Sequence, residues 1–331
     1  MQCVQVLDWE AGPKLATLDH PAKPSSPSMT QVHVVAVGQH QVVKSMASGK
    51  HYASGALPHI PGIDGVGVDT STNKMVYFFL LGIPGPRRGS YVEYINVPKT
   101  NVCELPKEVD PVQAAALMNA VMSSWMAFKG RVDFLHETNS PREAGDWTCL
   151  VLGATTMGGR MAIKTARTLG AKKVFGAGRN ESKLAKQDLD GRIVLREPAS
   201  STDFSPASTV SVVLDYLYGP HPQAFLESTA VQAYTASSPP LTFVSIGALA
   251  GAEASIPSAL LRSRDVTIRG AGIGGWDIRE LNAQVPAMMD VLKGVKLEEV
   301  QAMSVKKVES TWDHPEGERV VFVFDEKYAN V

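Results

Sequence analysis

The sequence predicts an α/β protein in which a β-rich domain precedes a domain built on a doubly wound parallel sheet. Short β-branched and aromatic runs, separated by Gly, Pro, Asn and Ser clusters, fill residues 1 to about 115. From Thr148 onward, strand-like and helix-like segments alternate at the spacing typical of βαβ units. After a helical segment at 280–293, the run RVVFVF at 319–324 returns to strand character. We therefore expect a C-terminal piece that rejoins the first domain.

The individual elements follow from the same patterns. In the N-terminal part we predict strands at Cys3–Leu7, Val32–Gly38, Gly65–Asp69, Met75–Leu80 and Ser90–Val97. The segment PVQAAALMNAVMSSWMAF (111–128) predicts two helical pieces. Beyond it, the runs TCLVLG, KVFGAG, RIVL, TVSVVLD, LTFVSIG and VTIRG predict strands, and 159–169, 222–235 and 280–293 predict helices.

Composition limits the classes of protein and partner. A chain of 331 residues with 44% hydrophobic and 20% charged residues is typical of a globular protein of about two domains. A net charge of -1 gives no reason to expect nucleic acid or a membrane as partner. The three cysteines form no Cys-x-x-Cys pair, and the most apolar window, 75–83, is too short to span a bilayer. We expect a cytoplasmic protein.

The segment VLGATTMGGRMAIKTARTLGA (151–171) resembles a nucleotide-binding loop between a strand and a helix. Such a loop needs small residues, because its backbone approaches a pyrophosphate at the helix N-terminus. The G-x-G-x-x-G pattern falls on Ala154, Thr156 and Gly159, of which only the last is glycine. The Thr156 side chain would crowd the diphosphate, although its hydroxyl could donate to it. We predict that the loop binds the cofactor through Gly153, Ala154, Thr155, Thr156, Met157, Gly158 and Gly159.

The end of the next strand indicates which dinucleotide binds. NAD enzymes carry an acid about 20 positions beyond the motif, whereas an Arg can meet the 2′-phosphate of NADP. Here that position is Arg179, followed by Asn180 and Lys183. These three residues favour NADPH over NADH. For the other basic residues nearby, Lys164, Arg167, Lys172 and Lys173, we favour a solvated helix face.

The whole chain resembles the zinc-free quinone oxidoreductase-like branch of the medium-chain dehydrogenase/reductase superfamily. The matching stretches are LPHIPGIDGVG (57–67), GSYVEY (89–94), AAALMNAVMSSWMAF (114–128), LGATTMGGRMAIKTARTLGA (152–171), AGRN (177–180), VVLDYLYG (212–219) and VSIGALAG (244–251). The resemblance implies a GroES-like substrate domain (1–118 and 270–331) and a Rossmann NADP(H)-binding domain (119–269). It also implies enoyl-reductase-like hydride transfer from NADPH to an activated C=C bond or a quinone.

Two departures from this superfamily concern the catalytic cleft. Zinc-dependent relatives carry Cys at the position of His40 and Gly-His-Glu where this chain has Gly-Ile-Asp at 62–64. The four-cysteine structural lobe is also missing, so we expect no metal. Zinc-free relatives usually read Gly-Leu-Asn-Pro-Val-Asp where this chain has 38–43, so His40 replaces their Asn.

The resemblance also assigns the remaining site residues. Tyr52 matches the family tyrosine over the cleft, and His40 falls where the reactive ring of the cofactor should lie. We predict both as catalytic donors of a proton or hydrogen bond, against the alternatives of a pocket wall for Tyr52 and a packed imidazole for His40. Ser123 is expected near the nicotinamide amide. The backbone of Ile246, Gly247, Ala248 and Gly272 is expected to flank the nicotinamide ring.

Three functions remain open at this point. The first is an NADPH-dependent reductase of an enone or quinone, with a specialised metabolite among the candidate substrates. The second is a non-redox cyclase or isomerase on the same fold, and the third is a non-catalytic binding protein. Arg179 and VSIGALAG favour the first, whereas His40 and Thr156 favour the others. We expect a small-molecule substrate and a monomer or homodimer.

Overall fold

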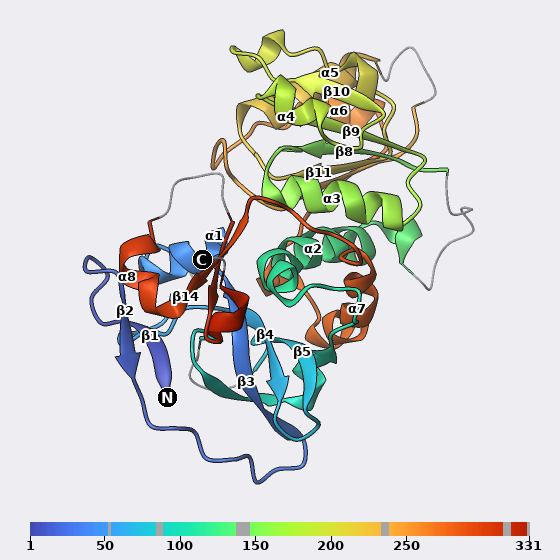
Figure 1. Cartoon of the computed structure of the whole chain (residues 1–331). Coiled ribbons are helices and arrows are strands. Elements are labelled where there is room, and N and C mark those ends of the chain that lie inside the picture. The colour runs from blue at the N-terminus through green and yellow to red at the C-terminus, as the bar shows by residue number, and fades with distance from the viewer. Residues whose placement is uncertain (52–53, 84–88, 137–145, 233–237, 314–318, 330–331) are drawn as a thin grey trace. The chain divides into compact units, whose positions relative to one another are not determined.

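The chain divides into two compact units in the computed structural model (Figure 1). The structure describes all residues except 52–53, 84–88, 137–145, 233–237, 314–318 and 330–331. One unit comprises residues 1–119 and 278–331, and the other comprises 120–277. The assignment of 1–118 with 270–331 to the substrate and of 119–269 to the cofactor stays a prediction.

The first unit is built on a mostly antiparallel seven-stranded sheet. Its strands are β3 (Met29–Gly38), β4 (Asp64–Asp69), β5 (Lys74–Phe79), β6 (Tyr94–Pro98), β7 (Val102–Glu104), β14 (Val300–Ser304) and β15 (Arg319–Val323). The strand order is β14-β15-β3-β4-β5-β7, with β6 also paired to β3. A separate hairpin joins β1 (Gln2–Val6) and β2 (Pro13–Thr17). Since Val321 of β15 lies opposite Gly38 of β3, the C-terminal strands complete an N-terminal sheet.

The first unit also holds helices and a hydrophobic core. The helices are α1 (Gln41–Ala47), α7 (Ile278–Asp290) and α8 (Val308–Thr311). The core combines Val34 and Val37 of β3 with Phe322 of β15, all fully buried. Trp312 stacks on Phe322 with ring centroids 6.1 Å apart. Residues from both ends of the chain therefore share one core.

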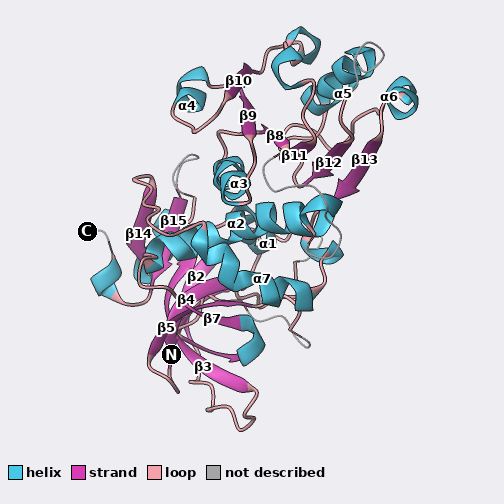
Figure 2. Ribbon diagram, turned by 90° about the vertical axis from the view of Figure 1, so that its right-hand side faces the viewer, coloured by secondary structure: helices cyan, strands magenta, loops and turns pink. Residues whose placement is uncertain are grey.

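The second unit holds a six-stranded, fully parallel sheet (Figure 2). Its strands are β8 (Thr148–Leu152), β9 (Lys173–Gly178), β10 (Gly191–Val194), β11 (Val212–Asp215), β12 (Leu241–Ser245) and β13 (Val266–Gly270). Its helices are α3 (Met157–Thr168), α4 (Glu181–Ala185), α5 (Pro220–Gln232) and α6 (Ser258–Ser263). The order β10-β9-β8-β11-β12-β13 is 3-2-1-4-5-6 in chain order, which is the doubly wound Rossmann arrangement. The predicted α/β class is confirmed.

Both faces of the sheet are buried along the central strands β8 and β11, where alternate residues point to opposite sides. Cys149 and Val151 of β8 pack in one cluster with Ala162 of α3. Leu150 belongs to a second cluster with Phe225 of α5. The continuous apolar runs of the sequence are thus explained by helices on both faces.

The prediction of two helical pieces at 111–128 is wrong. The structure has one helix, α2 (Pro111–Arg131), which has no Gly or Pro between 112 and 129. Ser123 donates its hydroxyl to Ala120 O, and Ser124 donates to Val121 O. These bonds to the preceding turn satisfy both hydroxyls without ending the helix.

Other element boundaries also differ. The strand predicted at 90–97 begins only at Tyr94, whereas β2 and β14 carry too few alternating apolar residues to be predicted. The predicted helices at 159–169, 222–235 and 280–293 correspond to α3, α5 and α7, each beginning two residues earlier. Within the described residues, no helix has both the length and the apolar character required to cross a bilayer.

Candidate functional site

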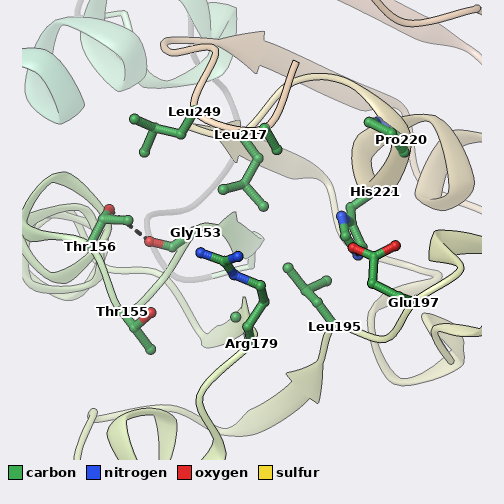
Figure 3. A pocket seen from close by; sticks show the side chains of 12 residues that line it. Gly153, Thr155, Thr156, Arg179, Leu195, Glu197, Leu217, Pro220, His221 and Leu249 are labelled. Carbon is green, nitrogen blue, oxygen red and sulfur yellow. Dashed lines mark hydrogen bonds and ion pairs between the residues drawn. The ribbon is translucent and has the colours of Figure 1, made fainter.

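A pocket of about 300 Å³ opens at the carboxyl ends of the parallel strands in the second unit (Figure 3). Its lining residues are Gly153, Thr155, Thr156, Gly178, Arg179, Leu195, Glu197, Leu217, Pro220, His221, Leu249 and Ala250. They lie at or after the carboxyl ends of β8, β9, β10, β11 and β12. In doubly wound sheets, ligands bind at this edge, where the strand order reverses on either side of the first strand.

Three glycines let the end of β8 and the start of α3 lie close together: Gly153 in the loop, and Gly158 and Gly159 in the first turn of α3. Gly153 has a φ of +89°, which side chains rarely adopt. A Cβ on Gly159 would lie 2.2 Å from the carbonyl oxygen of Gly153, and one on Gly158 would lie 2.8 Å from the ring of Tyr216. These glycines therefore let the first turn of α3 approach the end of β8 closely.

Thr156 caps the N-terminus of α3. Its hydroxyl oxygen accepts from the amide of Gly159 at 3.0 Å, and its hydroxyl donates to Gly153 O at 2.8 Å. The hydroxyl hydrogen that was expected to reach a diphosphate is therefore used within the loop. The amides of Met157 and Gly158 have no hydrogen-bond partner within the described part of the chain. They lie at the positive end of a 12-residue helix, where an anion is favoured.

Arg179 follows β9 and points into the pocket (Figure 3). Its guanidinium is exposed and makes no hydrogen bond or ion pair with any residue that the structure describes. The next residue, Asn180, caps α4 by accepting from the amide of Lys183 at 2.8 Å. Lys183 itself is exposed and does not line the pocket. Of the three residues predicted to select the cofactor, Arg179 alone is free to meet an anion in the pocket.

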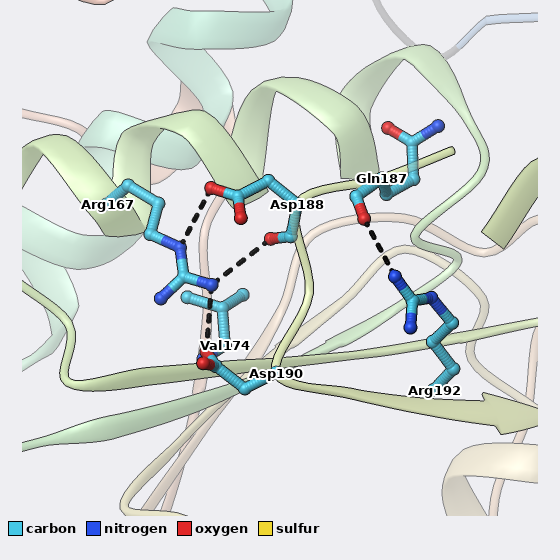
Figure 4. A network of polar contacts seen from close by, with 6 residues as sticks. All are labelled: Arg167, Val174, Gln187, Asp188, Asp190 and Arg192. Carbon is cyan, nitrogen blue, oxygen red and sulfur yellow. Dashed lines mark hydrogen bonds and ion pairs between the residues drawn. The ribbon is translucent and has the colours of Figure 1, made fainter. Parts of the chain in front are cut away.

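Arg167 is engaged elsewhere, in a polar network on the outside of the sheet (Figure 4). Its Nε lies 3.2 Å from Asp188 Oδ2, and its Nη2 lies 2.8 Å from Asp190 Oδ2. Asp190 Oδ2 also accepts from the amide of Val174 at 2.7 Å. Burial acts to raise the pKa of Asp190, but the Val174 amide and Arg167 outweigh it and hold the pKa below its ordinary value. Arg167 therefore joins α3 to the segment between β9 and β10.

Glu197 and His221 line the same pocket and were not predicted from the sequence. The Nε2 atom of His221 lies 3.0 Å from Arg196 O and 3.6 Å from Glu197 Oε1. Since a carbonyl only accepts, Nε2 carries a proton and donates to Arg196 O. The Glu197 side chain is 76% exposed. Its place three residues after β10 was the available signal, because ligand-binding side chains gather after strand ends.

Asp215 ends β11 and is fully buried. Its Oδ1 accepts from the amides of Leu217 at 2.9 Å and Tyr218 at 3.1 Å, which holds the turn where Tyr218 has a φ of +52°. Burial raises the pKa of Asp215 to about 6, against the lowering effect of the two amides. Asp215 therefore caps the turn that follows β11 by accepting from two of its amides.

The residues predicted around the nicotinamide do not line the pocket. The hydroxyl of Ser123 donates to Ala120 O at 2.9 Å. The amides of Ile246 and Gly247 donate to Asp215 O at 2.8 and 3.2 Å. A Cβ on Gly272 would meet no atom within 4 Å. Their assignment to the nicotinamide, with that of Ala248, stays a prediction.

His40 belongs to a buried polar network in the first unit. Its side chain is 1% exposed, and its Nε2 lies 2.9 Å from Asp64 Oδ1. Arg319 Nη1 lies 3.3 Å from the other ring nitrogen, Nδ1. Because a guanidinium only donates, Nδ1 accepts and Nε2 donates to Asp64. Tyr77 donates its hydroxyl to Asp64 Oδ2 at 2.9 Å.

This network engages both nitrogens of His40. Burial and the neighbouring Asp64 charge raise the pKa of Tyr77, so Tyr77 stays a donor to Asp64. For His40 to donate to a substrate, its bond to Asp64 must first be released. Tyr52, the other predicted catalytic donor, lies outside the described residues. Among the residues that are described, no three His, Cys, Asp or Glu side chains form a group that could hold a metal ion.

Known proteins resemble the chain along its whole length. It is 30% identical to the probable NADPH-dependent quinone reductase tdiC of Emericella nidulans, over 98% of this chain and 100% of the relative. It superposes with a TM-score of 0.70 and 21% identity on the quinone oxidoreductase of Thermus thermophilus, solved also with NADPH. It superposes with a TM-score of 0.71 and 17% identity on the Escherichia coli quinone oxidoreductase bound to NADPH. Both superpositions cover 98% of this chain and 100% of the other. No family model matches the sequence.

Proposed function

The chain belongs to the zinc-free quinone oxidoreductase-like branch of the medium-chain dehydrogenase/reductase superfamily, and we propose that it uses NADPH to reduce a quinone or the C=C bond of an enone. One observation carries the proposal. Arg179, a cation with no partner among the described residues, points into the pocket that is also lined by Thr156, the N-cap of α3. Such a pocket offers separate sites for two anionic groups of one ligand.

The pocket and the adjoining first turn of α3 fit NADPH. The amides of Met157 and Gly158, at the positive end of α3, are suited to the diphosphate. Gly159 permits the close approach of this turn to the loop. The guanidinium of Arg179 can donate two parallel hydrogen bonds to two oxygens of a 2′-phosphate. We propose these four residues as the phosphate-binding set, with Thr156 acting through the helix cap rather than through the phosphate.

When bound, NADPH supplies a hydride to an electron-poor carbon of the substrate. The chain must then stabilise the negative charge on the substrate oxygen and deliver a proton. We assign this part to Tyr52. His40 contributes directly only if its bond to Asp64 opens, and otherwise holds the loop before α1 in place. We further propose that the enzyme acts in the cytoplasm on a small molecule, as a monomer or homodimer, which fractionation and light scattering can test.

Cofactor titration tests the binding half of this proposal. NADPH should quench the protein fluorescence at far lower concentration than NADH. The Arg179→Ala variant should lose about 10- to 100-fold in NADPH affinity and nothing for NADH, because a hydrogen bond to a charged group contributes about 1.5–3 kcal/mol. Lys164→Ala is the matched control, since it removes one exposed charge from α3 outside the pocket. Equal affinities for the two cofactors would exclude this role for Arg179.

Turnover tests the chemical half. The assay follows the absorbance of the reduced nicotinamide and the formation of product over a panel of quinones and enones. We expect the absorbance to fall as product forms. The Tyr52→Phe variant should depress turnover about 100-fold while leaving NADPH affinity unchanged. Product formed without consumption of NADPH would instead identify a non-redox cyclase or isomerase. Binding without any turnover over the whole panel would favour a binding protein.

A further inference from the structure

The pocket beyond Arg179 has apolar walls and one acidic group. Leu195, which is 7% exposed, and Leu217 extend into it from different strand ends (Figure 3). Glu197 lies on the side of Leu195, next to His221 (Figure 3). Apolar walls suit the two faces of a planar heteroaromatic ring, whose polar atoms lie on its edge. The carboxylate of Glu197 then faces the polar edge of the ring.

Resting on the proposed NADPH function, we propose that Glu197 accepts a hydrogen bond from the exocyclic amine of the adenine ring and so selects this base. The adenine amine only donates, and an ionised carboxylate only accepts. Glu197 receives no hydrogen bond from any residue that the structure describes, and His221 Nε2, 3.6 Å from its Oε1, already donates to Arg196 O. The carboxylate oxygens therefore remain available to a ligand.

The alternative is that Glu197 opposes the 2′-phosphate at Arg179. No ion pair joins Arg179 to Glu197 among the described residues, although they follow the neighbouring strands β9 and β10. Glu197 is grouped with His221 at one side of the pocket, whereas Arg179 lies between the leucines and the loop at 153–156 (Figure 3). From this order along the pocket, we place the phosphates of NADPH at Arg179 and α3. The adenine base then lies at the two leucines and Glu197.

The probe is the analogue of NADPH in which unsubstituted purine replaces adenine, because a hydrogen replaces the exocyclic amine while N1 stays an acceptor. The Glu197 carboxylate then meets no donor on the ring. We expect the protein to bind NADPH about 10-fold more tightly than the analogue, which is the usual loss for one hydrogen bond to a charged group. Glu197→Gln should bring the ratio to about 1, because an amide both donates and accepts. Dissociation constants are measured by fluorescence, without turnover.

Glu181→Gln is the matched control, since it removes an exposed acid of α4 that does not line the pocket. It should leave the preference for adenine intact. Equal wild-type affinities for NADPH and the analogue overturn the role of Glu197 and leave the proposed function standing. A Glu197→Gln variant that gains affinity for NADPH but not for NADH also overturns it, since Glu197 then opposes the 2′-phosphate. Failure to bind either nucleotide overturns both proposals.

Discussion

Asp215 is expected to make the stability of the protein depend on pH in a direction opposite to that of a paired surface carboxylate. Its pKa is raised from 3.8 to about 6 by burial at the end of β11. Between these two values, the folded state binds more protons than the unfolded state. Stability from this group is therefore fully present below the unfolded pKa and is lost as pH rises through the folded pKa.

The size of the effect follows from the shift. One pKa unit corresponds to about 1.4 kcal/mol, so ionised Asp215 costs the folded state about 3 kcal/mol at high pH. Over the range from about pH 8 to about pH 5, where most proteins stay folded, linkage predicts a recovery of about 1.4 kcal/mol. The Asp215→Asn variant does not titrate, and its amide oxygen can still accept from Leu217 and Tyr218. The buried amide hydrogens that this substitution introduces carry a cost, but that cost is independent of pH.

Urea unfolding of both proteins at several pH values measures the difference in unfolding free energy. All other titrating groups are shared, so the difference isolates Asp215. We expect the wild type to lose about 1.4 kcal/mol relative to Asp215→Asn as pH rises from about 5 to about 8. A difference that stays constant over this range would refute the assignment of a raised pKa to Asp215. A change of opposite sign would show that the two amides stabilise the charge more than burial opposes it.

Three further predictions concern the cap, the His40 network and metal. Thr156→Ala should lower stability by about 1 kcal/mol in thermal unfolding through loss of the cap, whereas Thr156→Ser should restore it. Tyr77→Phe removes a donor from buried Asp64 and should cost about 1–3 kcal/mol in urea unfolding; an unchanged midpoint would show that this bond contributes no stability. Metal analysis should find no stoichiometric zinc, and one tightly held zinc per chain, lost in His40→Ala, would contradict the zinc-free assignment.

The parallel sheet could be predicted because its strands are apolar on both faces and separated by regular helices. The positions of the loop at 153–159 and of Arg179 could be predicted for the same reason, since they follow from where a strand ends, whereas their roles toward the cofactor stay predictions. Local hydrogen bonding was harder to predict. The hydroxyl of Thr156 has one hydrogen, and whether it serves the helix cap or a ligand depends on the geometry of the turn.

Contacts between distant segments could not be predicted. Arg319 is 279 positions from His40 in the chain, so no local pattern indicates that it holds the ring nitrogen Nδ1. Glu197 and His221 enter the pocket from the segments that follow two different strands, β10 and β11. Their distance depends on the sheet order, in which these strands are separated by β9 and β8. The position of a residue that depends on a single strand end, such as Arg179, could therefore be predicted. The approach of Glu197 to His221 depends on two strand ends and was missed.

The pairing of β15 with β3 has a consequence for the order in which the chain folds during synthesis. Residues 120–277 form one uninterrupted segment and have left the ribosome while β15 is still being made. Until Arg319–Val323 emerge, the edge of β3 at Ala36–Gly38 has no partner strand, and the N-terminal core lacks Phe322. An unpaired strand edge is a site where other chains can add. The unit whose synthesis begins first is thus the last to be completed. The edge of its strand β3 stays unpaired while the whole second unit is translated.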